Sequence, residues 1–251
     1  MTQWLQQRGA EMKAALIVLT RLPLPELSPF PPQGRVVWAY PIAGAAVGLI
    51  GGMAMLLAGL ALPAAMAAVL GLAVSVLLTG ALHEDGLADF WDGIGGGRAR
   101  AEKLAIMRDS HLGSYGALAL ILSFAARLTA LAALGPLGAL AFVTAQAMSR
   151  GALALPMRLN PPARSDGLIA EAGKPGPFAF MAAIGLPLAL SLVVLPGASG
   201  LIAAAAACAA AWLVGLIARF QVGGITGDVL GAAVQMAEIA FLWTIAASLA
   251  A

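Results

Sequence analysis

The chain has 251 residues, of which 61% are hydrophobic and 10% are charged, and its formal net charge is +2. A soluble domain carries about 25% charged residues, so this composition excludes an ordinary soluble fold. The 14 Lys and Arg residues are scattered and form no basic stripe, which excludes a nucleic-acid-binding protein. We therefore expect an all-α, polytopic membrane helix bundle in which residues 1–251 form a single integral membrane domain.

Seven apolar segments, each bounded by Gly, Pro or charged residues, are candidate transmembrane helices. A bilayer core of about 30 Å needs roughly 20 apolar residues per helix. The candidates cover residues 36–58, 62–82, 117–134, 136–156, 178–196, 200–218 and 229–250. Several are short or contain proline, so the pattern predicts about seven spans and is also compatible with one re-entrant pair.

The distribution of charge predicts the orientation of these spans. The connectors at 59–61, 135 and 197–199 carry no charged residue, whereas the N-terminal segment and the other loops carry most of the basic residues. Because basic loops face the cytoplasm, we expect a cytoplasmic N-terminus and cytoplasmic active-site loops, with Ala251 on the far side.

Three ionisable residues fall inside predicted spans. They are Arg127 in the third span, Arg150 near the cytoplasmic end of the fourth, and Glu238 in the seventh, about as deep as Arg127. Charged groups at such depths need a partner or water. Two interpretations stay open, namely a structural Arg127–Glu238 ion pair and a role in substrate binding.

An acidic segment follows the second predicted span. Asp85, Asp89 and Asp92 stand at i, i+4 and i+7, so a helix would place all three carboxylates on one face. Oxygen ligands of this kind suit Mg²⁺, which usually binds one or two carboxylates together with substrate phosphates. The alternative is a solvated acidic helix end. His83 lies on the opposite face, so we expect an interfacial residue, or one that supports the metal ligands, rather than a metal ligand itself.

Two further aspartates adjoin turns that end near predicted spans. Asp109 lies between Arg108 and Ser110. Such a turn can supply another carboxylate, and its backbone N–H groups can bind a phosphate. Asp228 closes the glycine-rich stretch 223–227 at the start of the last span. Each aspartate could instead simply favour a helix N-terminus.

The residues from His83 to Gly93, from Ile106 to Ser110 and from Gly113 to Gly116 resemble the cobalamin synthase family, also called adenosylcobinamide-GDP ribazoletransferase. Further similar stretches lie at 19–25, 40–44, 148–150, 163–168 and 224–228. The resemblance implies the last assembly step of cobalamin biosynthesis, in which a ribazole or its 5′-phosphate displaces GMP from adenosylcobinamide-GDP with Mg²⁺. It places the enzyme in the bacterial cytoplasmic (inner) membrane, among membrane lipid.

The resemblance also implies roles for individual residues. The family's acidic pattern carries over, as catalytic and Mg²⁺-binding residues, to Asp85, Asp89, Asp92, Asp109 and Asp228. Residues expected to bind the substrate phosphates or the GMP leaving group are His83, Arg108, Ser110, Arg150, Arg164 and Lys174. Guanidinium groups suit phosphate geometry. The alternative is that these basic residues only reflect the excess of Lys and Arg found in cytoplasmic loops. A homo-oligomer is compatible with the sequence.

Two rival functions share parts of the pattern. The stretch 89–93 fits the opening of the CDP-alcohol phosphotransferase motif, but Gly96 and Gly97 stand where that motif has Ala-Arg. A cation transporter could use Arg127 and Glu238, yet transporters tend to bind at the midplane between two matching halves. No convincing internal repeat is found here.

Overall fold

The computed structural model describes residues 2–195 and 197–250, and this part of the chain forms helices and their connections without a β-strand. The helices are α1 (Thr2–Leu19), α2 (Gln33–Val36), the 3₁₀ turn η1 (Val37–Ala39), α3 (Tyr40–Gly59), α4 (Ala64–Thr79), α5 (Leu82–Gly96), α6 (Arg100–Ile106), α7 (Ser114–Leu134), α8 (Leu137–Gly151), α9 (Ala154–Leu159), α10 (Pro177–Val194), α11 (Ser199–Val222) and α12 (Gly227–Ala250). The expected all-α class is confirmed.

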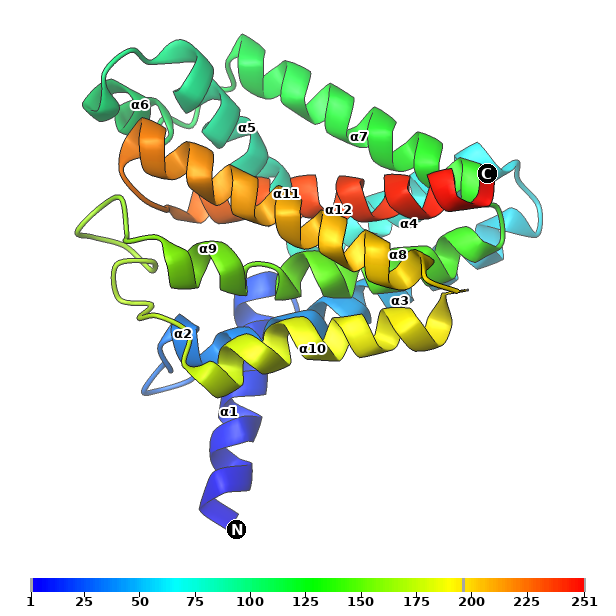
Figure 1. Ribbon diagram of the computed structural model, residues 1–251, viewed down its shortest axis with the longest axis horizontal. Helices are drawn as coiled ribbons and strands as arrows, with labels where there is room; N and C mark the ends of the chain where they lie inside the picture. Colours follow the sequence, from blue (N-terminus) through cyan, green and yellow to red (C-terminus); the bar gives the residue numbers. More distant parts are fainter. Residues whose placement is uncertain (1, 196, 251) are drawn as a thin grey trace.

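The long helices run roughly side by side, and α12 lies in the interior of the bundle (Figure 1). It packs against α5, α7, α8 and α11. Small residues such as Ala233 and Ala237 are fully buried along α12, and small side chains let neighbouring helix backbones approach closely. Close helix contacts around α12 therefore form one part of the core, and the packing of α3 against α8 and α4 forms another.

Every predicted span corresponds to a helix, but fewer helices than seven are long enough to cross a bilayer unaided. Among the described residues, five helices have the length and hydropathy of a span: Gln33–Gly59, α7, α10, α11 and Gly227–Leu249. The pair α4 and α5 could supply a sixth, although it is bent by 87°. Helix α8 has only 15 residues, because the chain turns after Gly151. The protein is thus a multi-pass membrane protein with five or six such spans.

The bend between α4 and α5 positions the acidic segment. Gly80 and Ala81 both adopt left-handed backbone conformations, with φ of 64° and 58°, and end α4 at Thr79. The second predicted span was expected to continue to residue 82, but α5 starts there in a new direction. Helix α5 is therefore not one of the five spanning helices.

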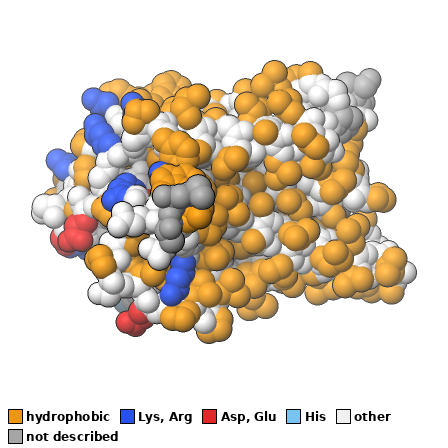
Figure 2. All heavy atoms as spheres, turned by 90° about the horizontal axis from the view of Figure 1, so that it is seen from below, with side chains coloured by type: hydrophobic (Ala, Val, Ile, Leu, Met, Phe, Trp, Pro, Cys, Tyr) orange, Lys and Arg blue, Asp and Glu red, His pale blue; other side chains and the backbone are white. Residues whose placement is uncertain are grey.

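Charged side chains gather at one end of the molecule, whereas most of the visible surface is hydrophobic (Figure 2). Helix α1 projects across the direction of the bundle (Figure 1). Its buried Glu11 carboxylate is 2.7 Å from the Arg8 guanidinium and 3.2 Å from that of Arg35, and it accepts a 2.8 Å hydrogen bond from the Trp38 indole. These contacts fasten α1 to the segment that precedes α3.

Candidate active site

The three predicted carboxylates do lie on one helix, α5, but their surroundings differ. Asp85 is exposed, Asp89 is half-buried, and Asp92 is buried with 7% of its surface exposed. Burial increases along the helix because its C-terminal part packs against α6 and α7. The carboxylates on this face are therefore exposed near the N-terminus of α5 and buried near its C-terminus.

Asp228 joins this face through a close crossing of two helices. A Cβ atom on Gly86 of α5 would lie 3.0 Å from the Cα of Gly231 and 3.2 Å from the Cα of Asp228, both on α12. No side chain other than hydrogen fits between these backbones. The crossing brings the start of α12 against the N-terminal half of α5, although Asp85 and Asp228 are far apart in sequence.

The loop after α9 places a positively charged side chain near the carboxylates. Ala163 and Ile225 are linked by a 2.8 Å backbone hydrogen bond, and a second one of 2.9 Å joins Ile225 to Pro161. This short bridge holds the next residue, Arg164, beside α12, where its guanidinium lies 3.9 Å from the Asp228 carboxylate. The same side chain donates a 2.8 Å hydrogen bond to the backbone oxygen of Leu104.

The electrostatics of Asp89 show that these carboxylates act on one another. Burial and, after it, the negative charges of Asp85, Asp228 and Asp92 together raise the pKa of Asp89 to about 7. Arg164 acts in the opposite direction. Mutual repulsion of this kind is relieved by a bound cation or by protonation. The sequence prediction that Asp228 converges on the α5 carboxylates is thus consistent with the structure.

Asp92 has a structural task at the N-terminus of α7. Its two carboxylate oxygens accept 2.8 Å hydrogen bonds from the backbone N–H groups of Gly113 and Gly116. Cβ atoms on these glycines would lie 2.4 and 2.3 Å from those oxygens, so only glycine leaves room for the carboxylate. Asp92 therefore caps α7 from a neighbouring helix. The positive end of the α7 dipole stabilises its negative charge.

A cleft lined by three arginines adjoins the carboxylates. Arg100 and Arg108, on or just after α6, and Arg164 line a cavity of ≈ 690 Å³ between α6 and the loop 163–166. The Arg108 guanidinium contacts both carboxylate oxygens of Asp166 at 2.7 and 2.6 Å on the surface. The cleft offers guanidinium groups suited to phosphates. Arg100 was not predicted, because nothing in the sequence distinguishes it from other basic loop residues.

Several predicted residues are not among those that line this cleft. Asp109 is exposed, and its carboxylate accepts hydrogen bonds from the backbone and ring of His111. Ser110 is exposed in the same connection between α6 and α7. Lys174 is exposed and borders a separate cavity of ≈ 210 Å³ beside Met157 and Ile225.

His83 and Arg150 lie in the interior of the bundle, within a network of buried charges. The Arg150 guanidinium is 3.5 Å from Glu238 and 3.3 Å from the His83 ring. Arg127 is 3.1 Å from Glu84 and 3.7 Å from Glu238. The predicted Arg127–Glu238 ion pair is therefore present, and it is extended by partners that the sequence did not indicate. The network joins α5, α7, α8 and α12.

The carboxylate oxygens at this site suit a hard cation such as Mg²⁺, although they do not form a complete coordination sphere. Within the described part of the chain, no three His, Cys, Asp or Glu side chains are arranged to hold a metal ion. Mg²⁺ does not need such a cage, because it usually combines one or two carboxylates with substrate phosphates and water. Asp85, Asp89 and Asp228 supply oxygens of the right kind. The pKa of Asp89 is raised first by burial and then by the neighbouring carboxylates, whose negative charge a cation would offset.

Comparison with known proteins assigns the chain to a family. The profile of the cobalamin-5-phosphate synthase family matches residues 11–246. The chain belongs to this family. Adenosylcobinamide-GDP ribazoletransferases are similar to it along nearly their whole length: that of Azorhizobium caulinodans is 45% identical over 93% of this chain and 94% of its own, and that of Mesorhizobium japonicum is 47% identical over 92% and 91%. That of Bradyrhizobium diazoefficiens is 43% identical over 98% and 96%. No solved structure matches the chain.

Membership of the cobalamin-5-phosphate synthase family makes the protein an enzyme and supports the resemblance seen in the acidic segment. It sets aside both the CDP-alcohol phosphotransferase and the transporter. Glu84, between His83 and Asp85, has a structural role. Its carboxylate accepts hydrogen bonds from Arg127 at 3.1 Å and from Gln235 at 2.9 Å, so it anchors the first turn of α5 to α7 and α12.

Proposed function

We propose that the protein transfers a ribazole, or its 5′-phosphate, onto adenosylcobinamide-GDP and releases GMP, which completes the cobalamin skeleton. The observation that carries this proposal is the meeting of Asp85, Asp89 and Asp228 beside a cleft lined by arginines. Carboxylates for a cation and guanidinium groups for phosphates are the two parts that a transfer at a pyrophosphate needs.

In this reaction a ribose hydroxyl of the acceptor attacks the phosphorus that is attached to the cobinamide. A new O–P bond forms, the bond to the bridging oxygen breaks, and GMP leaves with that oxygen. Arg100, Arg108 and Arg164 line the cleft in which we place the phosphates and the leaving group. One of the clustered carboxylates accepts the hydroxyl proton.

Mg²⁺ is the cofactor that we propose for this site. Asp85, Asp89 and Asp228 would hold it, and the ion would neutralise negative charge on the pyrophosphate oxygens. Asp92 helps indirectly, because its cap on α7 keeps the end of α5 in place. We propose no direct contact of Asp109, His83, Arg150 or Lys174 with the reacting phosphates.

The protein also needs an orientation that exposes this site to its nucleotide substrate. We propose that the charged end faces the cytoplasm of a bacterium and that the protein resides in the inner membrane. The support is the charge-free set of connectors at the opposite end, together with the positive-inside rule.

The experiment is a transfer assay with detergent-purified, full-length protein. Adenosylcobinamide-GDP is incubated with free ribazole or with its 5′-phosphate, and both GMP release and the corrinoid product are measured. Asp85→Ala and Asp228→Ala should each lower kcat by about a hundredfold or more. Glu26→Ala is the control, because Glu26 is an exposed carboxylate outside the site. Absence of transfer with either acceptor, or full activity of both aspartate variants, would refute the proposal.

A further inference from the structure

One face of α12 meets α5 at three successive levels. Asp228, Gly231 and Gln235 are spaced by three and four residues, so they lie on the same side of α12. Asp228 belongs to the candidate site, and Gly231 makes the close crossing with Gly86. One level further along, Gln235 donates a 2.9 Å hydrogen bond to the Glu84 carboxylate. The candidate site is therefore linked, through the crossing, to a buried polar contact between the same two helices.

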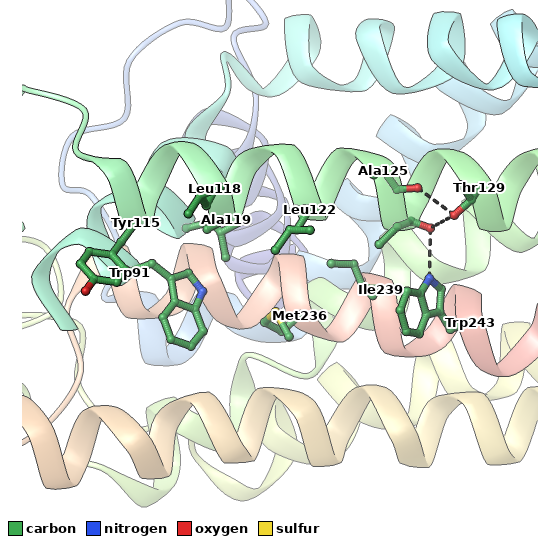
Figure 3. A pocket seen from close by; sticks show the side chains of 13 residues that line it. Trp91, Tyr115, Leu118, Ala119, Leu122, Ala125, Thr129, Met236, Ile239 and Trp243 are labelled. Atoms are coloured by element: carbon green, nitrogen blue, oxygen red, sulfur yellow. Dashed lines mark hydrogen bonds between the residues drawn. The ribbon is translucent and has the colours of Figure 1, made fainter. Parts of the chain in front are cut away.

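Glu84 connects α5 to two neighbouring helices at once. Besides Gln235 of α12, its carboxylate contacts the Arg127 guanidinium of α7 at 3.1 Å. Gln235 in turn accepts a 2.9 Å hydrogen bond from the Ser123 hydroxyl, which also belongs to α7. All four side chains are buried. The groove that α7 and α12 line further along is largely apolar, with side chains such as Ile239 (Figure 3). The Glu84 contacts are thus specific polar links in a largely apolar interior.

A second polar contact holds the other end of α5. The Asp92 carboxylate accepts two 2.8 Å hydrogen bonds from backbone N–H groups at the start of α7. Asp85 and Asp89 lie between Glu84 and Asp92, so the segment that carries them is fastened to other helices at both ends. The crossing at Gly86 sets how closely α5 approaches α12, but a glycine has no side chain that could stop α5 from turning about its own axis.

We propose that Glu84 and Gln235 are positioning residues, which hold α5 at the rotation that lets Asp85 and Asp89 share a divalent cation with Asp228. This inference rests on the proposed function, because it concerns the cation that these carboxylates would bind. A carboxylate lies about 5–6 Å from the axis of its helix, so turning α5 by about 10° would move it by about 1 Å. A displacement of about 1 Å can lower a rate by about a hundredfold.

The competing interpretation is that Glu84 only neutralises the buried Arg127. A buried charge needs a partner of opposite sign, but charge balance does not require Gln235, which is neutral. Arg127 would keep Glu84 and Glu238 at 3.1 and 3.7 Å without it. Gln235→Leu therefore separates the two interpretations, because it removes the hydrogen bond between α5 and α12 and leaves every charge in place.

The test measures binding of Mn²⁺, a paramagnetic probe of the Mg²⁺ site, to the full-length protein in detergent by electron paramagnetic resonance. The temperature is one at which every variant is folded. Gln235→Leu should raise the Kd for Mn²⁺ and lower kcat for ribazole transfer, each by about tenfold. The exchange variant Glu84→Gln/Gln235→Glu keeps the total charge and lets the two side chains swap donor and acceptor, so it should restore most of both quantities.

Trp243→Phe is the matched control. It also removes a hydrogen bond from α12, the 3.1 Å bond that the Trp243 indole N–H donates to the Ala126 backbone on α7 (Figure 3). This bond does not involve α5, so the Kd for Mn²⁺ and kcat should stay close to those of the wild-type protein.

The outcomes distinguish this inference from the proposed function. Weaker Mn²⁺ binding in Gln235→Leu, with recovery in the exchange variant but no ribazole transfer by the wild-type protein, would support the positioning role and refute the transferase. Transfer by the wild-type protein, with unchanged Mn²⁺ Kd and kcat in Gln235→Leu, would overturn the positioning role alone. Equal weakening in Gln235→Leu and Trp243→Phe, or no recovery in the exchange variant, would indicate a general loosening of the bundle and would also overturn it.

Discussion

Gly86 of α5 and Gly231 of α12 cross so closely that a Cβ on Gly231 would lie 2.9 Å from the Cα of Gly86. This contact between backbones sets the separation of the two helices that carry Asp85, Asp89 and Asp228. The candidate site thus depends on two residues that have no side chain.

The first prediction concerns this crossing. Gly231→Ala should force α5 and α12 apart and lower kcat by about tenfold or more, because small displacements of catalytic groups are costly. Gly185→Ala is the control, since Gly185 lies in α10 with no heavy atom within 4 Å of an added Cβ. Transfer activity and thermal stability of both variants are measured together. Unchanged kcat in Gly231→Ala would show that the crossing does not set the site.

The second prediction concerns the cap on α7. Asp92→Ala leaves the N–H groups of Gly113 and Gly116 without their acceptor and should reduce stability by about 1–2 kcal/mol. Asp92→Asn keeps one acceptor oxygen and should lose less. Asp85→Ala, at an exposed position on the same helix, should hardly change stability. Unfolding in detergent checks this order, and equal stability of the Asp92 and Asp85 alanine variants would contradict it.

The third prediction concerns the buried ion pairs. Arg127→Met leaves Glu84 and Glu238 with a single arginine, Arg150, and should destabilise the protein by about 3–5 kcal/mol. Adding Glu84→Gln removes the excess negative charge, so the double variant should be more stable than Arg127→Met alone. Thermal unfolding of the two variants in the same detergent makes the comparison. If the second substitution lowers stability further, the buried charges are not balanced as the structure indicates.

The fourth prediction concerns pH. The pKa of Asp89 is raised from 3.8 to about 7, first by burial and then by Asp85, Asp228 and Asp92. Between these two values the folded protein binds a proton that the unfolded chain does not, so stability should fall as pH rises through this window. Asp89→Asn should flatten this dependence. Melting temperatures at pH 5 and pH 7.5, measured with a chelator present, provide the check, and parallel curves for both proteins would refute it.

The fifth prediction concerns orientation. In a Cys208→Ala background, Ser165→Cys lies in the exposed loop beside the arginine cleft, and Leu60→Cys lies at the opposite end, where Leu60 is 84% exposed. A membrane-impermeant maleimide added to intact cells should label position 60, and position 165 only after permeabilisation. Labelling of position 165 alone in intact cells would reverse the proposed topology.

Local patterns were sufficient to predict the class and much of the architecture. Apolar length marked α3, α4, α7, α8, α10, α11 and α12 but not α5, and the spacing of Asp85, Asp89 and Asp92 correctly placed them along one helix. These features follow from hydropathy and helical periodicity, which depend on residues near one another in sequence. The number of spans was less certain, because turns such as Gly80–Ala81 break an apolar run without changing its composition.

Tertiary structure alone decided which polar residues meet. One helical face carries Asp85 and Asp92, yet Asp92 is buried and caps α7 while Asp85 is exposed. Arg150 was expected at the substrate and instead pairs with Glu238 in the interior. Such outcomes depend on how each helix is rotated and how closely its neighbour approaches, as at Gly86 and Gly231. Sequence spacing specifies the face of one helix, whereas packing with the other helices determines what that face contacts.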